Sequence, residues 1–245
     1  MRIADDIRTR IETGEYRPGQ QLPTYDELAA EYLCSLAVVR KAVDLLRQQG
    51  LVITRQGKGS YVRERPRARR HGMDRYARRH WAAGRAVLEA EAAQQGYTAT
   101  QLIRALGEEP APAPVAERLN VEPGTPVFVR RRTTLIEDRP NQLADSYYPL
   151  AIAEKVPRIT EEDTGPGGGF ARLEETGYAL ARIREELSVR MPTGPESVAL
   201  KLPEGTPVVE LIRTAIDVSG EPVEVMLAII AGDMITFDYE FPVPD

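Results

Sequence analysis

Apolar residues in the first third of the chain follow short helical patterns separated by turns. Ile3, Ile7 and Ile11 recur every four residues, which places them on one face of a helix. A second helix is predicted to begin after Thr24, because Thr24 and Glu27 have the spacing of a capping box, in which each side chain bonds the other residue's backbone N–H. The chain therefore begins with at least two short amphipathic helices.

A third helix is predicted directly after the second. Ser35 is a residue type that favours the N-cap position, and Val39, Val43 and Leu46 then fall on one helical face. Only a tight turn at 33–35 separates the two helices. Two short helices joined in this way are typical of a helix-turn-helix.

A glycine-flanked basic segment follows the third helix. The apolar run 51–54 is followed by Arg55-Gln56-Gly57-Lys58-Gly59 and then by a second short apolar run. The two glycines allow a tight turn with positive φ and bring the backbone close to a polyanion. Helix, strand, basic tip and strand together predict a winged helix.

The rest of the chain contains an internal repeat. Residues 119–133 recur as 200–214, with seven of fifteen positions identical, and each copy continues into a predicted strand, turn and return strand. Helical spacing over 81–105 and apolar residues over 173–177 and 183–187 lead us to expect helices there. We therefore expect an α+β domain with a central antiparallel sheet.

Charge is distributed unevenly along the chain. The net charge is −5, but residues 1–80 carry +7 and residues 81–245 carry −12. A basic first third joined to an acidic body is typical of a nucleic-acid-binding module attached to a second domain. The alternative is an ordinary solvated charge distribution.

Several function classes are not supported by the composition. One cysteine and two scattered histidines predict neither a disulfide framework nor a metal site, and no motif implies a cofactor. No Ser/His/Asp set or nucleotide-binding loop indicates an enzyme. No apolar run is long enough to span a membrane, and no secretory signal is seen, so we expect a cytoplasmic location.

An arginine-rich segment separates the two halves. Eight arginines lie within 63–80, so we expect residues 64–80 to be an exposed linker between a DNA-binding domain at 1–63 and a second domain at 81–245. The arginines either add contacts to DNA phosphates or are simply solvent-exposed residues of the linker. Trp81 is expected to anchor the second domain.

Residues 3–62 resemble the winged-helix domain of GntR-type bacterial transcription regulators. The resemblance is carried by Pro18-Gly19, Leu22-Pro23-Thr24, Glu27-Leu28-Ala29, Val39-Arg40-Lys41-Ala42 and the segment 55–62. It implies that the third helix enters the major groove and that the wing contacts the minor groove. The DNA-binding residues it implies are Thr24, Tyr25, Ser35, Leu36, Ala37, Val38, Arg40, Lys41, Arg55, Gln56, Gly57, Lys58 and Gly59.

Two positions depart from the family pattern. Asp26 and Leu36 stand where the family usually has arginines that read bases. Apolar side chains at the head of the third helix can instead contact thymine methyl groups. We therefore predict an operator that differs from the common family consensus. The alternative for Leu36 is simple packing within the helical domain.

The second half resembles the UTRA ligand-binding domain of the HutC subgroup, which is similar to the chorismate lyase fold. The marks include Pro126-Val127, Ser146-Tyr147-Tyr148-Pro149 and Pro222-Val223-Glu224. The resemblance implies an effector site formed by Arg130, Arg132, Thr134, Ser146, Gly168, Gly169, Phe170, Arg184 and Glu224.

Alternatives remain open for several of these residues. Arg132 is also consistent with a surface salt bridge, the glycines at 167–169 with a flexible loop, and Glu224 with a cross-strand pair. Thr134 and Ala144 replace an Arg and a Glu that are usual in members that bind sugar phosphates, which argues against an amino-sugar phosphate ligand.

Together the two resemblances imply a homodimeric repressor. Pairing through the C-terminal domain would place two wings on a palindromic double-stranded DNA operator, and a small-molecule effector, with an anionic one as the candidate, would alter DNA affinity. The alternatives are an enzyme, suggested only by the lyase-like fold, and a constitutive DNA-binding or plasmid-control protein whose body only dimerises.

Overall fold

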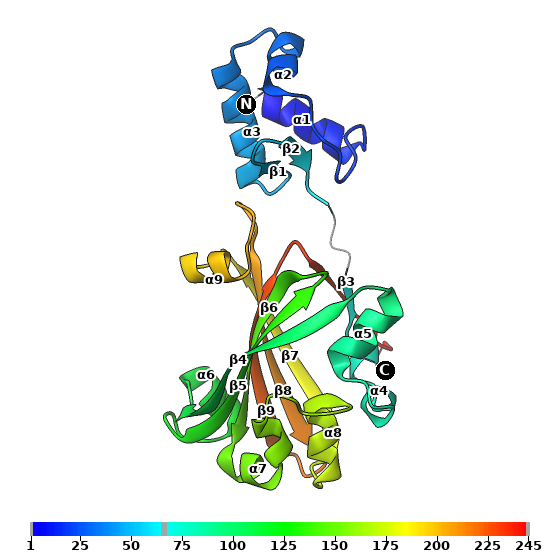
Figure 1. The fold of residues 1–245 in the computed structure, drawn as a ribbon, viewed down its shortest axis with the longest axis vertical. Helices are drawn as coiled ribbons and strands as arrows, with labels where there is room; N and C mark the ends of the chain where they lie inside the picture. Colours follow the sequence, from blue (N-terminus) through cyan, green and yellow to red (C-terminus); the bar gives the residue numbers. More distant parts are fainter. Residues whose placement is uncertain (1, 65–67, 244–245) are drawn as a thin grey trace.

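The computed structural model describes residues 2–64 and 68–243. A small helical domain with a β-hairpin lies at one end, and a larger domain built on a twisted sheet lies at the other (Figure 1). Only a short stretch of chain connects them. The predicted α+β organisation is therefore present.

The N-terminal domain contains three helices and a hairpin, in the order α1 (Arg2–Glu12), α2 (Tyr25–Glu31), α3 (Leu36–Gln48), β1 (Val52–Arg55) and β2 (Gly59–Val62). The expected apolar faces pack together in one core that includes Ile7, Leu28 and Val43. The capping box is formed: Glu27 N donates to Thr24 Oγ1 over 3.2 Å, and Thr24 N donates to Glu27 Oε2 over 2.7 Å. Ser35 occupies the N-cap of α3, but its hydroxyl makes no capping bond.

The second domain contains a six-stranded antiparallel sheet. Its strand order is β4-β5-β6-β9-β8-β7. The strand bounds are β4 (Ala99–Pro110), β5 (Pro126–Ile136), β6 (Arg139–Pro149), β7 (Leu180–Arg190), β8 (Val208–Asp217) and β9 (Pro222–Ala231). The repeated sequences form the hairpins β5–β6 and β8–β9, which join through β6 and β9 at the centre of the sheet.

The repeat extends to the elements around each hairpin. The short helices α6 (Ala113–Leu119) and α9 (Gly194–Ala199) each precede one copy. Just beyond them, Asn120 and Lys201 occupy equivalent positions and both adopt positive φ, 55° and 50°. This shared and uncommon conformation shows that the two copies have the same backbone path at this point.

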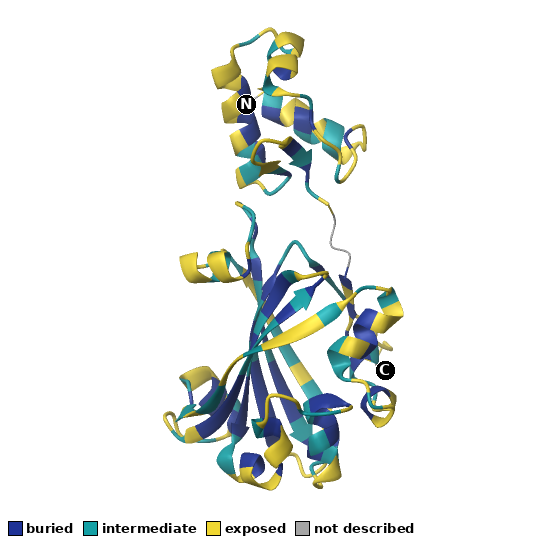
Figure 2. Ribbon diagram, in the orientation of Figure 1, coloured by how far each residue is buried: buried dark blue, intermediate teal, exposed yellow. Residues whose placement is uncertain are grey.

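Opposite faces of the sheet pack against different helices. Val127, Val129 and Tyr147 contact α6, whereas Phe128 and Tyr148 face the cluster that includes α7 (Leu150–Lys155) and α8 (Gly168–Glu175). The alternation follows from the two-residue period of a strand. Figure 2 shows the central strands mostly buried and the edge strand β4 largely exposed.

Three sequence expectations for the body need correction. Residues 99–105, which we expected to be helical, belong to β4, and residues 183–187 belong to β7. Both are edge strands, where a short apolar run has no strict alternation to distinguish it from a helix turn. The helix expected over 173–177 is α8, which ends at Glu175.

The arginine-rich segment is more ordered than we predicted. Residues 68–71 form β3 (Ala68–His71), which pairs in parallel with β10 (Ile235–Asp238), and they are followed by η1 (Asp74–Tyr76), α4 (Arg79–Ala82) and α5 (Val87–Gln95). Arg70 and Arg75 are only 3% and 7% exposed. The prediction that this segment is too polar to pack is therefore wrong for these two arginines; the predicted linker residues 65–67 lie outside the described residues.

Candidate functional site: a recognition helix, a wing and an arginine-lined cavity

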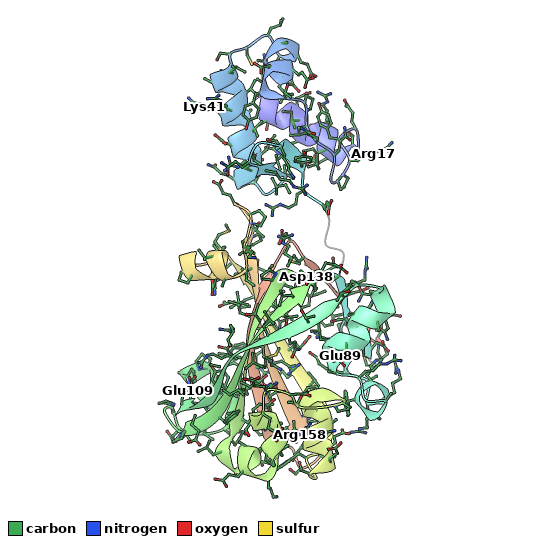
Figure 3. All side chains as sticks on the ribbon, viewed as in Figure 1. Arg17, Lys41, Glu89, Glu109, Asp138 and Arg158 are labelled. Carbon is green, nitrogen blue, oxygen red and sulfur yellow. The ribbon has the colours of Figure 1, made fainter. Side chains whose placement is uncertain are left out.

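The exposed side of α3 carries the residues predicted to contact DNA. Leu36 and Val38 are 41% and 46% exposed, and Ala37, Arg40 and Lys41 are also exposed. Figure 3 shows Lys41 on the outer side of α3. The buried face of the helix consists of Val39, Ala42, Val43 and Leu46. The structure therefore leaves Leu36 outside the core.

The side chains at the start of α2 are less available for contact with DNA than those of α3. Thr24 is committed to the capping box, with its hydroxyl bonded to Glu27. Tyr25 is partly buried and packs against the domain core. These two positions therefore offer DNA mainly the first backbone amides of α2, which point away from the helix.

The wing tip is held open towards solvent by three contacts. Gly57 and Gly59 have φ of 71° and 101°, as the tight turn requires. Gln21 Nε2 and Tyr61 Oη both donate to Lys58 O, over 2.9 and 3.0 Å. The Arg55 guanidinium stacks 4.8 Å from the Tyr61 ring centroid. Lys58 and Gln56 remain exposed, so a fixed loop presents an exposed cation.

A cavity of about 110 Å³ lies between the sheet and the start of α8. It is smaller than a typical drug-sized pocket and suits a small ligand or one small group. Its lining comes from β3, η1, β4, β5, β6, β8, β9, the first residues of α5 and α8 and the segments that lead into these two helices: Arg70, Arg75, Ala86, Val87, Leu88, Gln101, Arg130, Arg132, Thr134, Gln142, Ala144, Tyr148, Thr164, Gly167, Gly168, Gly169, Phe170, Arg213, Glu224 and Met226. Five lining residues are arginines and one is a carboxylate, so the cavity is strongly cationic.

Arg213 and Glu224 form the internal ion pair of the cavity. Arg213 Nη2 donates to Glu224 Oε2 over 2.9 Å, and Tyr148 Oη donates to Glu224 Oε1 over 3.1 Å. Burial opposes ionisation of Glu224, but the charges of Arg213 and Arg132 and the hydrogen bonds from Ser146 and Tyr148 together keep the pKa of this carboxyl below its usual value. The Arg213 guanidinium also lies 4.8 Å from the Phe170 ring centroid. Glu224 is thus both a cavity residue and a cross-strand partner.

Arg130 and Arg132 enter the cavity from the same face of β5. Arg130 donates to the carbonyls of Glu161 and Glu162 and so holds the loop that precedes α8. Arg132 Nη2 donates to Ser146 Oγ over 2.5 Å, whereas its buried Nε has no partner. Arg131 points to the other face of the sheet, where it pairs with Glu109 and Asp145.

The start of α8 presents backbone donors to the cavity. Gly167, at the N-cap, has φ of 82° and no side chain caps the helix. The amides of Gly167 and Gly168 bond to Gly84 O and Gly165 O, which leaves the next amides, at Gly169 and Phe170, without intrahelical acceptors. A Cβ at Gly167 would lie 2.7 Å from Trp81 O. The glycine is therefore required for close packing as well as for conformation.

Most of the effector residues implied by the family resemblance meet at this cavity. Arg130, Arg132, Thr134, Gly168, Gly169, Phe170 and Glu224 all line it. Ser146 lies behind Arg132 as a hydrogen-bond acceptor. Arg184 is not brought to the cavity: it lies on β7, 67% exposed, near Glu186.

Sequence reasoning missed several cavity residues. Arg213 had a usable signal, because it is the repeat counterpart of Arg132. Arg70 and Arg75 were assigned to an exposed linker, and no local pattern in the sequence indicates that β3 pairs with β10. Gln142 and Tyr148 also line the cavity.

The two domains also touch. Arg47, in the last turn of α3, pairs with Glu204. Arg63, just after the wing, donates to Thr206 Oγ1 over 2.7 Å and to Glu204 O over 3.0 Å. All of these contacts reach the loop 200–206, which begins the second copy of the repeat and leads into β8. Loop 200–206 thus connects the recognition helix to the sheet that lines the cavity.

Comparison with known proteins matches both domains to one family. Residues 1–62 match the bacterial regulatory proteins of the gntR family, and residues 94–236 match the UTRA domain. An uncharacterised HTH-type transcriptional regulator of Streptomyces coelicolor is 33% identical over 249 residues, which cover 99% of this chain and 92% of that protein. The chain belongs to the GntR family. With its UTRA domain it is a transcriptional regulator of the HutC type, with a DNA-binding and an effector-binding domain.

Other relatives of this GntR-family chain agree. The probable fructoselysine utilization operon transcriptional repressor of Escherichia coli is 26% identical over 96% of this chain and 90% of that protein. A crystal structure described as a GntR-family transcriptional regulator superposes with a TM-score of 0.68 at 28% identity, covering 99% of this chain and 97% of the other. The similarity therefore extends across both domains.

Two further features bear on the site. Within 2–64 and 68–243, no group of three or more His, Cys, Asp or Glu side chains is placed to hold a metal ion. None of the described helices is long and apolar enough to cross a membrane.

Proposed function

We propose that this chain is a cytoplasmic, homodimeric repressor that binds a palindromic operator and changes its DNA affinity when a small anionic effector occupies the arginine-lined cavity. The observation that carries the effector class is the charge of the cavity lining, five arginines against one glutamate. Buried cations of this density are stabilised by an anion. Relatives that are named repressors support the direction of regulation.

The exposed residues of α3 and the wing support the proposed mode of DNA binding. Arg40 is placed to reach a base edge or a phosphate, and Lys58 at the wing tip to reach a phosphate. Leu36, Ala37 and Val38 offer an apolar surface for thymine methyl groups. The domain contacts at loop 200–206 offer a physical route by which occupancy of the cavity can alter the position of α3.

We infer that the chain regulates rather than catalyses. The cavity contains no nucleophile–base pair: its side chains other than arginine are mainly neutral, and its one carboxylate is already paired with Arg213. A constitutive DNA-binding protein is the remaining alternative, and it predicts no response to any ligand.

A selection from random double-stranded DNA with the full-length protein tests the proposal. We expect an enriched sequence with two inverted half-sites, bound by a species of twice the monomer mass in analytical ultracentrifugation. R40A is expected to weaken binding by about 1–3 kcal/mol at one base position, and K58A to weaken binding to all sequences and lower the salt slope by about 1. DNA binding that enriches no sequence and does not depend on salt, or no DNA binding at all, would argue against this function.

The matched control is Arg158→Ala. This arginine lies far from α3 and the wing (Figure 3) and is largely exposed. Its removal changes the net charge as R40A does. A similar loss of affinity in R158A would assign the effect to overall charge rather than to the recognition helix.

A further inference from the structure

The two repeats give the cavity pairs of equivalent residues. Arg132 and Arg213 are counterparts in the repeated sequence. On the return strands, Gln142 lies opposite Thr134 and Glu224 lies opposite Ala215. Thr134 and Ala215 are counterparts in the repeat, so Gln142 and Glu224 also occupy equivalent positions. The second repeat therefore contributes a carboxylate at the position where the first repeat contributes a neutral amide. Charge symmetry between the halves is broken at this pair, as it is at Arg130, whose counterpart is Leu211.

The neutral member of the pair faces an arginine from outside the repeats. Arg70 Nη2 donates to Gln142 Oε1 over 2.8 Å. Its Nε and Nη1 are buried without any hydrogen-bond partner. Within the described part of the chain no carboxylate lies within ion-pair distance of Arg70, and its guanidinium is otherwise covered by the Phe237 ring, 5.2 Å away. Arg70 is thus a buried cation with one neutral partner.

Three of the other four arginines of the cavity are better compensated. Arg213 has Glu224. Arg75 lies 3.6 Å from Glu91 and 3.9 Å from Glu185. Arg130 has two carbonyl acceptors. Burial, reinforced by the charge of Arg75, lowers the pKa of Arg70 to about 10, which is the direction expected for a cation without a counter-ion.

We propose that Arg70 binds the anionic group of the effector, which supplies the negative charge that Gln142 does not. An oxyanion such as a carboxylate or phosphate group accepts from several N–H groups at once, and Arg70 has two buried nitrogens, Nε and Nη1, that make no hydrogen bond. Arg132, which lines the same cavity, has a third such nitrogen, its Nε. This assignment rests on the proposed effector-dependent regulation.

The position of Arg70 in the chain gives the assignment a regulatory meaning. Arg70 lies on β3, the first described strand after the wing, and Arg63 lies seven residues earlier in the contact with loop 200–206. Figure 1 shows that β3 begins at the end of the second domain that is nearer to the DNA-binding domain. An anion that is bound by Arg70 is therefore attached to the segment that carries the DNA-binding domain. Ligand binding would fix that segment directly, in addition to any change in the sheet.

Inorganic phosphate is the probe for this assignment. We would titrate the full-length protein with phosphate at constant ionic strength, following heat by calorimetry and melting temperature in parallel. Wild type should bind in the millimolar range, and R70Q should bind at least about ten-fold more weakly, the loss of one charge-assisted contact. R69Q is the matched control, because Arg69 is the exposed neighbour on the same strand. It should bind like wild type.

A second variant tests the charge argument if R70Q fails to fold. Q142E places the missing carboxylate beside Arg70, so it should raise the melting temperature without phosphate and abolish the further rise with phosphate. Phosphate binding by R70Q or Q142E equal to that of wild type, or no binding to wild type, would overturn the assignment. Operator binding is measured separately. A wild-type protein that binds no operator would refute the proposed function rather than the assignment of Arg70.

Discussion

Arg47, in the last turn of the recognition helix, forms an ion pair with Glu204 of the effector-binding domain. Both side chains are partly exposed, and such a pair contributes only about 0–1 kcal/mol. The pair nevertheless marks where the tip of loop 200–206 meets the carbonyl end of α3. At this point the close approach of the loop backbone to the helix backbone constrains the relative position of the two domains more strongly than the ion pair does.

Gly205 provides the first prediction, with Gly124 as its counterpart in the repeat. Both glycines have positive φ, 71° and 84°, so alanine strains either by about 1–2 kcal/mol. A Cβ at Gly205 would lie 2.5 Å from the carbonyl oxygens of Arg47 and Gln48, whereas a Cβ at Gly124 would meet nothing within 4 Å. G205A should therefore release the domain contact, and G124A should not.

Limited trypsin digestion measures that release. Cleavage within the arginine-rich connecting segment should be several-fold faster in G205A than in G124A at matched melting temperature. Equal cleavage rates would mean that the contact at loop 200–206 does not restrain the DNA-binding domain.

Leu36 provides a prediction on sequence preference. Its side chain is 41% exposed at the start of α3, so L36R can be accommodated without burying a charge. The variant should shift the half-site enriched from a random DNA pool towards guanine at one position, because arginine pairs bidentately with guanine O6 and N7. The discrimination gained should be about 1–3 kcal/mol. An unchanged enriched sequence would mean that residue 36 does not face the bases.

The buried pair Arg213–Glu224 provides a stability prediction. Glu224 is 2% exposed and Arg213 is 7% exposed. E224Q leaves the arginine buried and uncompensated, which costs about 3–5 kcal/mol, and urea denaturation should show it. E221Q, at an exposed position of the same turn region, is the control and should change the free energy of unfolding by less than about 0.5 kcal/mol. A small effect of E224Q would indicate that water or ions already reach the pair.

Glu196 provides a pH prediction for the helix before loop 200–206. Arg190 Nη1 and Nη2 both donate to Glu196 over 2.7 Å, and these bonds lower the pKa of Glu196 to about 2 despite its partial burial. A depressed carboxyl pKa stabilises the fold at pH values above about 4.5 and loses that effect as pH falls towards about 2. E196Q should thus destabilise by about 1–3 kcal/mol at pH 7 and progressively less below pH 4.5. A pH-independent difference would assign the effect to packing.

Local patterns were sufficient to predict the DNA-binding domain. Its helices have complete apolar faces, a capping box and a glycine-flanked turn, and each of these is encoded within a few residues of the chain. The repeat likewise predicted the two hairpins. Parts of the edge strands β4 and β7 were mistaken for helices because their exposed faces carry scattered apolar residues such as Leu102 and Leu187, which hide the strand period.

The cavity could be predicted only in part, because its residues are brought together by long-range pairing. Arg130 and Arg132 were accessible through the family resemblance and Arg213 through the repeat. Arg70 was not, since its burial depends on β3 pairing with β10, more than 160 residues later in the chain. A run of polar residues is predicted to be solvent-exposed unless the distant strand with which it pairs is known.

The order of the strands also has a consequence for biosynthesis. β6, in the middle of the sheet, pairs with β9, and the cavity is lined from both strands. The DNA-binding domain is finished at residue 62, whereas the cavity cannot close until residue 238, the end of β10, has left the ribosome. At roughly 5–20 residues per second, the nascent chain carries a complete DNA-binding domain for on the order of ten seconds before it has any means of sensing the effector.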